Sequence, residues 1–511
     1  MELEPLSRPN YTYITNALNS RFRPTVANAA IDHSTELSGA YLKSDIIGAV
    51  CHYPSGVGWA VPGPHRPAVP GSTSLYNGKL AKSSYIYNGV CRYLAMEYHD
   101  SEKATQVAGR VAEFMDDVVI PREREALATG ETIPMAEIEE LWEMAKERDL
   151  FAPQVPEEYG GQGLGFRDML PSFEQVGRSL IGALAIRANA PQEGNMHTLE
   201  LVGTEEQKEE YLRPLVQGEI SSAFAMTEPR QGCGSDPKML QSTAVTDGDE
   251  WVINAHKWWT SDGMDADVFL LMARTDLEAH PYAGTSIILV PADADGVEVV
   301  RNVPTIGSHG ITERHGGHAE VKFDDVRVPV ENTLGEENEG FRIAQLRLGG
   351  GRLTHCMRFS GMAQRSLEIA KAYLAEREGF GTSLAEKQAL RHRIADAETR
   401  LHAARCMVRH AARELDRSDA RIEVAMAKMY TANVTNDAID LAVQCCGGNG
   451  IGKDLPIAHF YEAVRAFRIV DGADEVHRRT IARWAFDDVD DAEIENTLEF
   501  DEELRIDELD E

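Results

Sequence analysis

The sequence of 511 residues contains no apolar run close to the ~20 residues that a helix needs to cross a bilayer. It also lacks the charged and apolar leader of a secretory signal peptide. Cysteine is scarce: the seven that occur form no C-x-x-C pair, which argues against both a disulfide framework and a zinc site. These absences predict a cytoplasmic protein without a membrane span and without a bound metal.

Basic residues are also in short supply, with 51 Lys and Arg against 83 Asp and Glu and a formal net charge of −32. Such a charge repels a phosphate backbone, so the composition excludes non-specific nucleic-acid binding. Acids are concentrated in residues 487–511, which we interpret as a solvated acidic tail. Excess acid and a low content of Lys are typical of salt-adapted proteins, although a base composition that favours Arg explains the low Lys equally well.

Hydrophobic periodicity divides the rest of the chain into four parts. Residues 1–95 are rich in turns and show no sustained period, so we expect an appended, poorly ordered N-terminal extension, with a start at Met96 as an alternative. Residues 96–222 and 339–486 show the period of amphipathic helices, whereas 223–338 alternate as strands do. The predicted fold class is α+β and mostly α, with an N-terminal helical domain, a central antiparallel β-domain and a C-terminal helical bundle.

The individual elements follow from the same pattern. Helices are predicted at 101–120, 135–148, 166–180, 183–201, 205–217, 340–377, 383–415, 421–446, 457–469 and 473–485, with Thr204 as an N-cap. Strands are predicted at 251–255, 268–273, 285–291, 297–303 and 319–329, joined in part by Asp-Gly turns.

Hydroxyl side chains, glycines and tryptophan are concentrated in residues 222–263. Thr227 lies in T-E-P, Ser235 in G-S-D, and Trp259 and Ser261 in K-W-W-T-S. Hydroxyl groups and freed backbone amides are the partners that the polar ring edge of a flavin requires, and an indole supplies a wall for its apolar plate. Any one of these residues alone is better explained as a turn or core residue. Their combination and order favour a flavin site.

This segment resembles the central flavin-binding segment of the acyl-CoA dehydrogenases, and the resemblance extends over roughly residues 101–486. It implies that the cofactor is FAD and that the FAD ring is contacted by Phe224, Met226, Thr227, Ser235, Trp259 and Ser261. The residues R-Q-G-C-G-S-D follow T-E-P here, which is a longer stretch than the family usually has. The loop at the substrate mouth is therefore expected to differ from that of the family.

Two later segments also resemble flavin-binding parts of this family. One matches an R-x-x-F-G…Q segment that holds the pyrophosphate of the FAD bound by a neighbouring subunit, and the other matches a Q-x-x-G-G-x-G segment near the adenosine. The matching residues are Arg377, Phe380, Gln388, Gln444, Gly447 and Gly448. The resemblance therefore implies a homodimer or a homotetramer.

The catalytic base of the family usually lies in a Y-E-G-T-S-Q turn, and this chain has I-V-D-G-A-D at that place. Asp471 takes the position of the base, as is usual in the branch that includes acyl-CoA dehydrogenase family members ten and eleven; residues 349–358 resemble the same branch. A second base position of the superfamily falls on Gly351, which cannot take a proton. Asp471 is also an ordinary N-cap signal for the following helix, and both roles are compatible.

Substrate contacts are expected from Ser235, Arg352 and Gly472. Arg352 either holds the loop of the base or forms an ordinary ion pair. If the base lies elsewhere, Asp474 and Glu475 are the next carboxylates to consider. Several histidines show no metal-ligand spacing and are interpreted as structural or solvated: His256, His309, His315, His318, His355 and His477.

The resemblance implies an FAD-dependent acyl-CoA dehydrogenase that forms a 2-enoyl-CoA and passes electrons to an electron-transfer flavoprotein. This reaction requires a carboxylate that removes an α-proton, donors that polarise the thioester oxygen and an acceptor for the hydride that leaves Cβ. Two alternatives stay open: a flavin oxidase resembling nitroalkane oxidase, which also uses Asp, and a flavin-binding scaffold without catalysis. Motifs do not separate the dehydrogenase from the oxidase, and they do not indicate the length of the acyl chain.

Overall fold

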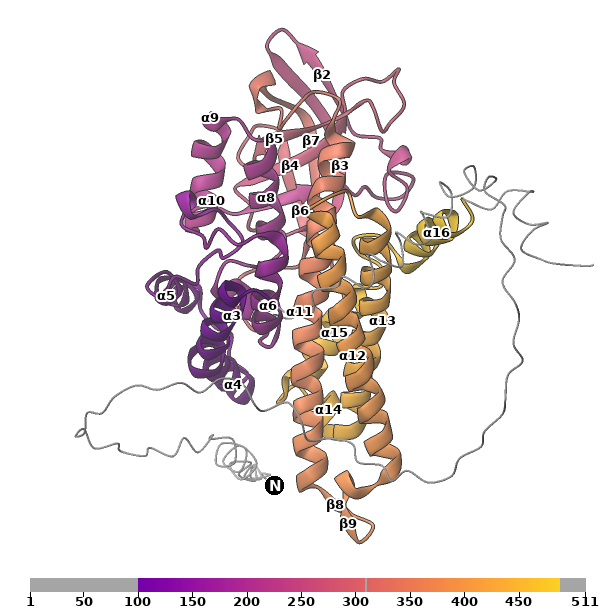
Figure 1. Cartoon of the computed structure of the whole chain (residues 1–511). Helices are drawn as coiled ribbons and strands as arrows, with labels where there is room; N and C mark the ends of the chain where they lie inside the picture. Colours follow the sequence, from indigo (N-terminus) through magenta and orange to yellow (C-terminus); the bar gives the residue numbers. More distant parts are fainter. Residues whose placement is uncertain (1–99, 308–309, 488–511) are drawn as a thin grey trace, which may run out of the picture. The chain divides into compact units, whose positions relative to one another are not determined.

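The computed structural model describes residues 100–307 and 310–487 of the chain. All of them belong to one structural unit that spans residues 80–511. Figure 1 shows short helices and a sheet beside a bundle of long helices, in the predicted order of helical, β and helical parts. The expectations for residues 1–95 and for residues 488–511 of the acidic tail lie outside the described residues.

The N-terminal helices are α3 (Glu102–Phe114), the π-helical turn η1 (Met115–Val119), α4 (Ile120–Thr129), α5 (Met135–Lys146), α6 (Phe166–Gly177), α7 (Gly182–Ala185), α8 (Gln192–Val202), α9 (Glu205–Gln207), η3 (Lys208–Leu212) and α10 (Arg213–Gln217). α3, η1 and α4 are continuous, so the predicted first helix runs on to Thr129. It ends at Gly130, whose φ of 73° is left-handed. The predicted N-cap Thr204 is confirmed, because its Oγ1 accepts a hydrogen bond from the amide of Gln207 at 3.2 Å.

One predicted helix is interrupted. The chain at 183–201 forms the single turn of α7 and then the separate helix α8. Between the two, Arg187 has a φ of 59°, which lies outside the helical region, and Pro191 has no amide hydrogen to donate. Apolar periodicity continues through this break, and for that reason the sequence pattern did not reveal it.

The middle of the chain forms β1 (Ser222–Ala225), β2 (Thr243–Asp247), β3 (Glu250–Ser261), β4 (Val268–Arg274), β5 (Thr285–Pro291), β6 (Val297–Asn302) and β7 (His318–Pro329). Their order in the sheet is β1-β4-β2-β3-β7-β6, with β5 paired to β4. The ladders between β2 and β3, β3 and β7, β4 and β5, and β6 and β7 are antiparallel. β1 pairs with β4 in parallel, and β2 meets β4 in parallel at one residue pair. The domain was expected to be antiparallel, but its sheet is mixed. The reason is that β1, which follows the N-terminal helices, pairs in parallel with β4 and not with the next strand in the chain.

The C-terminal bundle consists of α11 (Gly340–Glu376), α12 (Gln388–Leu415), α13 (Arg421–Cys446), α14 (Gly448–Ile451), α15 (Pro456–Ala466) and α16 (Asp474–Ala485). A hairpin of β8 (Glu378–Gly379) and β9 (Thr382–Ser383) joins α11 to α12. α11 has 37 residues, and a rise of about 1.5 Å per residue makes it roughly 55 Å long. Figure 1 shows the hairpin at one end of the long helices and the large sheet at the other. Among the described residues, no helix has the length and apolar character needed to span a bilayer.

α6 and α11 cross so closely that each carries a glycine at the crossing. A Cβ on Gly177 would lie 2.0 Å from the carbonyl oxygen of Arg358, and a Cβ on Gly361 would lie 2.1 Å from that of Glu174. Both distances are far below van der Waals contact, and the obstructing atoms belong to the backbone. The N-terminal helices and the bundle are therefore joined by direct backbone contact.

We expect Gly361→Ala to destabilise the protein, because the added methyl group must push α6 away from α11. Overpacking of a core costs about 1–3 kcal/mol, and a backbone obstacle places this change at the upper end of that range or beyond. Thermal unfolding followed by calorimetry measures the effect. Gly109→Ala in α3 is the matched control, since a Cβ on Gly109 meets nothing within 4 Å and Ala favours a helix by about 1 kcal/mol. An unchanged Tm for Gly361→Ala would contradict the close crossing.

Candidate active site

Most of the residues expected at a flavin ring come from the ends of two strands. β1 ends just before Met226 and Thr227, and β3 ends with Trp259 and Ser261. The amide of Trp258 donates a hydrogen bond to the carbonyl of Thr227 at 3.0 Å. The two strand ends therefore lie side by side, and the structure brings these residues of the motif together.

Trp259 is turned out of the sheet by an irregularity in β3. The register between β3 and β7 shifts between Lys257 and Thr260, and Trp259 has a φ of 55°. Such a β-bulge re-aims the side chains that it contains. The indole is 42% exposed, which is a large exposure for a side chain of this size. It presents a flat apolar surface at the edge of the sheet.

Three hydroxyl groups belong to the same strand ends and to the loop that follows β1. Those of Thr227 and Ser235 have no hydrogen-bond partner within residues 100–307 and 310–487. Ser261 Oγ lies 3.0 Å from Nδ1 of His318. Hydroxyls without internal partners and an exposed indole match a ring that has an apolar face and a polar edge. The residues present therefore fit a flavin.

The long loop after T-E-P is fastened by Glu228, which is buried. Its carboxylate accepts hydrogen bonds from the amides of Cys233 (3.1 Å), Gln241 (2.7 Å) and Ser242 (2.8 Å). The amide of Glu228 in turn donates to the carbonyl of Cys233 at 2.7 Å. One buried side chain thus holds both ends of the loop, and this accommodates its extra length.

Lys257 is fully buried and pairs with this carboxylate. Its Nζ lies 3.0 Å from Oε1 of Glu228 and donates to the carbonyl of Met226 at 3.1 Å. Burial alone raises the pKa of Glu228, but Lys257 and the bonds from Ser242 outweigh it and hold the pKa below its usual range. Burial lowers the pKa of Lys257. Neither residue was expected at the site, although the Glu of T-E-P and the Lys of K-W-W lie inside the motifs.

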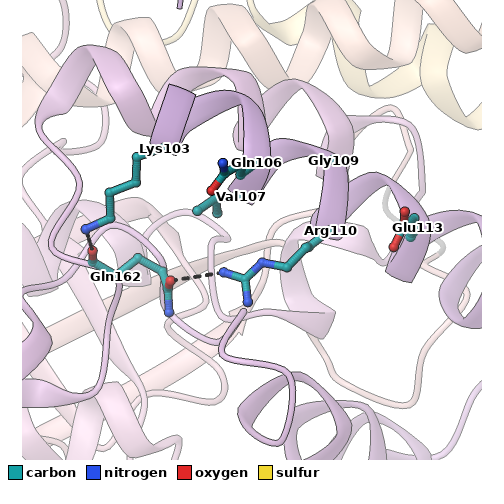
Figure 2. A pocket seen from close by; sticks show the side chains of 7 residues that line it. All are labelled: Lys103, Gln106, Val107, Gly109, Arg110, Glu113 and Gln162. Atoms are coloured by element: carbon teal, nitrogen blue, oxygen red, sulfur yellow. Dashed lines mark hydrogen bonds between the residues drawn. The ribbon is translucent and has the colours of Figure 1, made fainter. Parts of the chain in front are cut away.

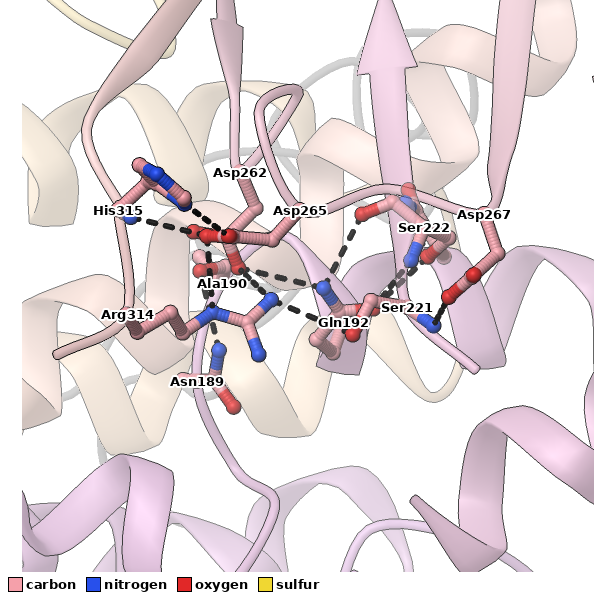
Figure 3. Close-up of polar contacts among 12 residues, drawn as sticks. Asn189, Ala190, Gln192, Ser221, Ser222, Asp262, Asp265, Asp267, Arg314 and His315 are labelled. Carbon is pink, nitrogen blue, oxygen red and sulfur yellow. Dashed lines mark hydrogen bonds and ion pairs between the residues drawn. The ribbon is translucent and has the colours of Figure 1, made fainter. Parts of the chain in front are cut away.

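A second polar network fixes the end of β3 from another direction (Figure 3). Asp262, the residue after Ser261, accepts hydrogen bonds from Gln192 Nε2 and Arg314 Nη2, each at 3.2 Å. Gln192 belongs to α8 and also bonds both backbone groups of Ser222 in β1, at 3.0 and 3.1 Å. Burial raises the pKa of Asp262, although Arg314 opposes the shift. The network anchors the two functional strands to the N-terminal helices.

Asp471 lies in the turn between α15 and α16, and its side chain is 19% exposed. Its backbone is left-handed, with a φ of 56°, as is that of Gly472 with 95°. The expected N-cap role is wrong: α16 begins at Asp474, its N-cap is Ala473, and no side chain makes the capping bond. Because Asp471 precedes the cap, its carboxylate is not engaged by the amides of the helix.

The turn of Asp471 is fastened through its backbone. Arg352 Nε donates to the carbonyl of Asp471 at 2.8 Å, and Lys428 Nζ donates to the carbonyl of Gly472 at 2.7 Å. Arg352 was expected either to hold the loop of Asp471 or to form an ordinary ion pair. Its hydrogen bond shows that it holds the loop. A Cβ on Gly472 would lie 2.8 Å from Nε2 of His477, so the turn requires glycine. These bonds leave the carboxylate itself for other partners.

His355 was interpreted as structural or solvated, and the structure places it against the carboxylate of Asp471. Its Nδ1 lies 3.2 Å from Oδ2 of Asp471 and 2.7 Å from the carbonyl oxygen of Gly351. A carbonyl only accepts hydrogen bonds, so Nδ1 carries the proton. Burial lowers the pKa of His355, and the ring is neutral at pH 7. Burial alone raises the pKa of Asp471, but electrostatic interactions with His355, Arg352 and Arg347 hold it below its usual range.

Arg347 lies near both Asp471 and Phe224, one of the residues expected at the flavin ring. Its Nε donates to Asn195 Oδ1 at 2.8 Å, and its guanidinium carbon lies 4.3 Å from the ring centroid of Phe224. Its charge also interacts with Asp471, which opposes the lowering of its pKa by burial. The structure therefore brings Phe224 and Asp471 into the surroundings of one guanidinium. The sequence motifs contained no signal for this residue.

The other residues matched to flavin contacts lie at the far end of the long helices. Arg377 follows α11, Phe380 lies in the β8–β9 turn with 96% exposure, and Gln388 begins α12. Gln444 lies in the last turn of α13, which ends at Gly447 with a φ of 59°. The two segments pack around one apolar cluster. They are close to one another but are separated from the ring site of the same chain by the length of the bundle (Figure 1).

A hollow on the surface of α3 is separate from these residues (Figure 2). It is lined by Lys103, Gln106, Val107, Gly109, Arg110, Glu113 and Gln162. None of the residues expected at FAD or substrate is among them, so we assign the hollow no part in the site. Within the described part of the chain, no group of three or more His, Cys, Asp or Glu side chains is arranged to hold a metal ion.

Comparison with known proteins gives matches to the acyl-CoA dehydrogenase N-terminal domain over residues 101–219, the middle domain over 223–326 and the C-terminal domain over 338–486. A protein of Mycobacterium tuberculosis named probable acyl-CoA dehydrogenase FadE2 is 39% identical over 400 residues, 76% of this chain and 96% of that protein. Acyl-CoA dehydrogenase family member 11 of Gallus gallus is 39% identical over 404 residues, 76% of this chain; the match spans about half (51%) of that relative. A glutaryl-coenzyme A dehydrogenase in complex with glutaryl-CoA matches with a TM-score of 0.69 and 28% identity, over 77% of this chain and 97% of that chain.

We expect Glu228→Ala to cost about 3–5 kcal/mol, because it leaves Lys257 as an uncompensated buried charge. Denaturant unfolding measures the loss, and Glu209→Ala is the control, because its pair with Arg213 is exposed, 63% and 43%, and such pairs contribute little to stability. Because folding depresses the pKa of Glu228, its contribution is complete above the ordinary range of Glu and is lost as the pH falls through the folded pKa. Equal losses for the two variants would contradict the buried pair.

Proposed function

The chain belongs to the acyl-CoA dehydrogenase family, and from that premise we propose that it is an FAD-dependent dehydrogenase of acyl-CoA thioesters. The observation that carries the proposal is the carboxylate of Asp471, which is ionised at neutral pH and held in a turn by Arg352 and Lys428. A fixed carboxylate of this kind can remove a proton from carbon. Bound FAD supplies the acceptor for the hydride that leaves Cβ.

We assign the FAD ring to the strand ends. The indole of Trp259 would lie against its apolar face, and the hydroxyls of Thr227, Ser235 and Ser261 would meet its polar edge. The exposure of the indole and the lack of internal partners for Thr227 and Ser235 within the described residues support this assignment. Lys257 and Glu228 hold the strand ends in place and do not need to touch the cofactor.

Asp471 takes the α-proton in this proposal. Its lowered pKa makes it a modest base, so the substrate must be made more acidic by stabilising charge on the thioester oxygen. The amide of Gly472 makes no hydrogen bond within the described residues and is a fixed donor next to the base. Preorganised donors of this type are among the largest contributions to catalysis of enolate-forming steps. Nδ1 of His355 lies 3.2 Å from Oδ2 of the carboxylate and packs the ring against it.

We further propose that the product is the 2-enoyl-CoA and that electrons pass to an electron-transfer flavoprotein, as the family resemblance implies. A flavin oxidase that uses Asp as its base is the second candidate, because Asp471 serves either reaction. The contacts of Asp471 disfavour a scaffold without catalysis, because the cations of Arg352 and Lys428 hold its loop and a histidine contacts its carboxylate.

The test is a panel of acyl-CoA thioesters, each mixed with the FAD-loaded protein in a stopped-flow instrument while the flavin absorbance is followed. We expect bleaching with at least one thioester, and a fall of about 10²- to 10⁴-fold in its rate for Asp471→Asn, the usual effect of losing a general base. Glu475→Gln, at a neighbouring carboxylate that is 78% exposed, is the control and should keep the rate.

Each result of this panel separates the candidates. Reoxidation by oxygen alone, as fast as by an electron-transfer flavoprotein or a dye, would favour the oxidase. A colourless protein that cannot be reconstituted with FAD would overturn the proposal as a whole. If Asp471→Asn bleaches at the wild-type rate, the base is another residue.

We also propose that the active unit is a dimer or a dimer of dimers. Arg377 and Phe380 cannot reach the ring site of their own chain, because about 45 Å of α11 separates Arg377 from Arg347 beside that site, yet they match residues that hold FAD in the family. The exposure of Phe380, 96%, supports a contact with another molecule. A neighbouring copy would complete each FAD site.

Light scattering on the FAD-loaded protein is expected to give a dimer or a tetramer. Arg377→Ala should weaken FAD binding, measured by flavin release during dialysis, because it removes a cation opposite the pyrophosphate. Arg213→Ala, at another exposed arginine, should not. A monomer that holds one FAD per chain would contradict the proposed assembly.

A further inference from the structure

Ser261 and His318 face each other across β3 and β7. The register of the two strands sets them opposite one another, and Ser261 Oγ lies 3.0 Å from Nδ1 of His318. The imidazole also meets the indole of Trp259 edge-on, with ring centroids 5.5 Å apart and an interplanar angle of 64°. His318 thus touches both the indole that the proposed function places against the face of the FAD ring and one of the hydroxyls that it places at the polar edge.

We propose that His318 is a positioning residue that fixes the hydroxyl of Ser261 and thereby tunes the reduction potential of the bound FAD. The inference rests on the proposed function, because it requires the ring beside Trp259 and Ser261. It adds a role for a histidine that has no place in the flavin-binding motifs of the sequence.

The backbone of His318 is held rigidly opposite β3. Its amide donates to Asn302 Oδ1 at 3.1 Å, and the carbonyl of Gly317 accepts a hydrogen bond from the amide of Asp262 at 3.1 Å. Gly317 has a φ of 68°, and a Cβ there would lie 2.7 Å from the side chain of Asn302. Asp262 directly follows Ser261 and belongs to the network of Figure 3. The distance between the hydroxyl and the imidazole is therefore set by the fold.

The imidazole controls the single proton of the Ser261 hydroxyl. Burial lowers the pKa of His318, so the ring is neutral at pH 7 and has one nitrogen that donates and one that accepts. If Nδ1 accepts, the Ser261 hydroxyl donates its proton to His318, and Oγ can then only accept hydrogen bonds from the FAD ring. If Nδ1 donates, the hydroxyl proton is free to point toward the ring. In both cases the hydroxyl no longer rotates freely.

The two oxidation states of a flavin differ in what they require from this hydroxyl. The reactive ring nitrogen accepts a hydrogen bond in the oxidised form and donates one in the reduced form. An Oγ that offers only lone pairs favours the reduced form, whereas one that offers its proton favours the oxidised form. A contact that selects one of these hydroxyl states therefore moves the equilibrium between the oxidation states.

The experiment measures the midpoint potential of the bound FAD by dye equilibration, without substrate. His318→Phe keeps a ring against Trp259 but removes the contact with Ser261, and we expect the reduction equilibrium to change about tenfold, which is about 30 mV for a two-electron couple. His318→Asn places a polar atom near the position of Nδ1 and should recover most of the wild-type potential. His318→Gln, which is polar but lacks an atom at that position, should behave like His318→Phe and serves if the latter loses FAD.

A double-mutant cycle shows whether His318 acts through the hydroxyl. Ser261→Ala should shift the potential by itself, and adding His318→Phe to it should have no further effect. His256→Phe is the control, because His256 also bridges β3 and β7, through Glu320 at 2.8 Å, but is 44% exposed and lies away from the site.

Additive shifts, or an unchanged potential in His318→Phe and His318→Gln, would overturn the inference while the proposed function stands. An equal shift in His256→Phe would likewise overturn it, because the effect would then belong to the strand pair. A wild-type protein that binds no FAD would instead overturn the proposed function, and this inference with it.

Discussion

The buried ion pair of Lys257 and Glu228 is the contact on which the flavin side of the site depends. Lys257 comes from β3 and reaches the backbone of Met226, while Glu228, at the start of the long loop, accepts hydrogen bonds from amides in its middle and at its end. Two charges removed from water are stable only when each keeps its partner, so strand, loop and site are energetically one unit. The loop tolerates its extra length because the carboxylate at its base, and not the number of its residues, sets the position of the strand ends.

Local patterns were sufficient to predict most of the fold. The long helices α11, α12 and α13 and the strands from β3 to β7 follow periods that are visible within a short window of sequence. The mistakes have a common cause: the break in the predicted helix at 183–201 and the parallel pairing of β1 with β4 are decided by contacts that a local pattern does not contain. The same holds for Asp471, whose turn imitates an N-cap signal but is shaped by Arg352 and Lys428 from other helices.

The site was predictable only where its residues form a motif. Thr227, Trp259 and Ser261 stand in fixed order in the chain, and the structure brings their strand ends together. His355 and His318 carry no such order, and each becomes significant through one partner from another element: the carboxylate of Asp471 for one, the hydroxyl of Ser261 for the other. A histidine at a site is therefore recognised by its partner more than by its sequence neighbours.

The cations around Asp471 suit a reaction in which a negative charge moves from the carboxylate to the substrate and the net charge of the site stays the same. The chain carries a net charge of −32, yet Asp471 is surrounded by cations, among them Arg347, Arg352 and Lys428. If the carboxylate takes an α-proton, as proposed, its charge passes to the enolate oxygen of the thioester. Cations that stabilised the carboxylate then stabilise the enolate, so the cost of holding Asp471 ionised in the resting site is largely returned in the transition state. A carboxylate with a raised pKa in an apolar pocket would be a stronger base. Such a pocket, however, would contain no cations to stabilise the negative charge on the enolate oxygen.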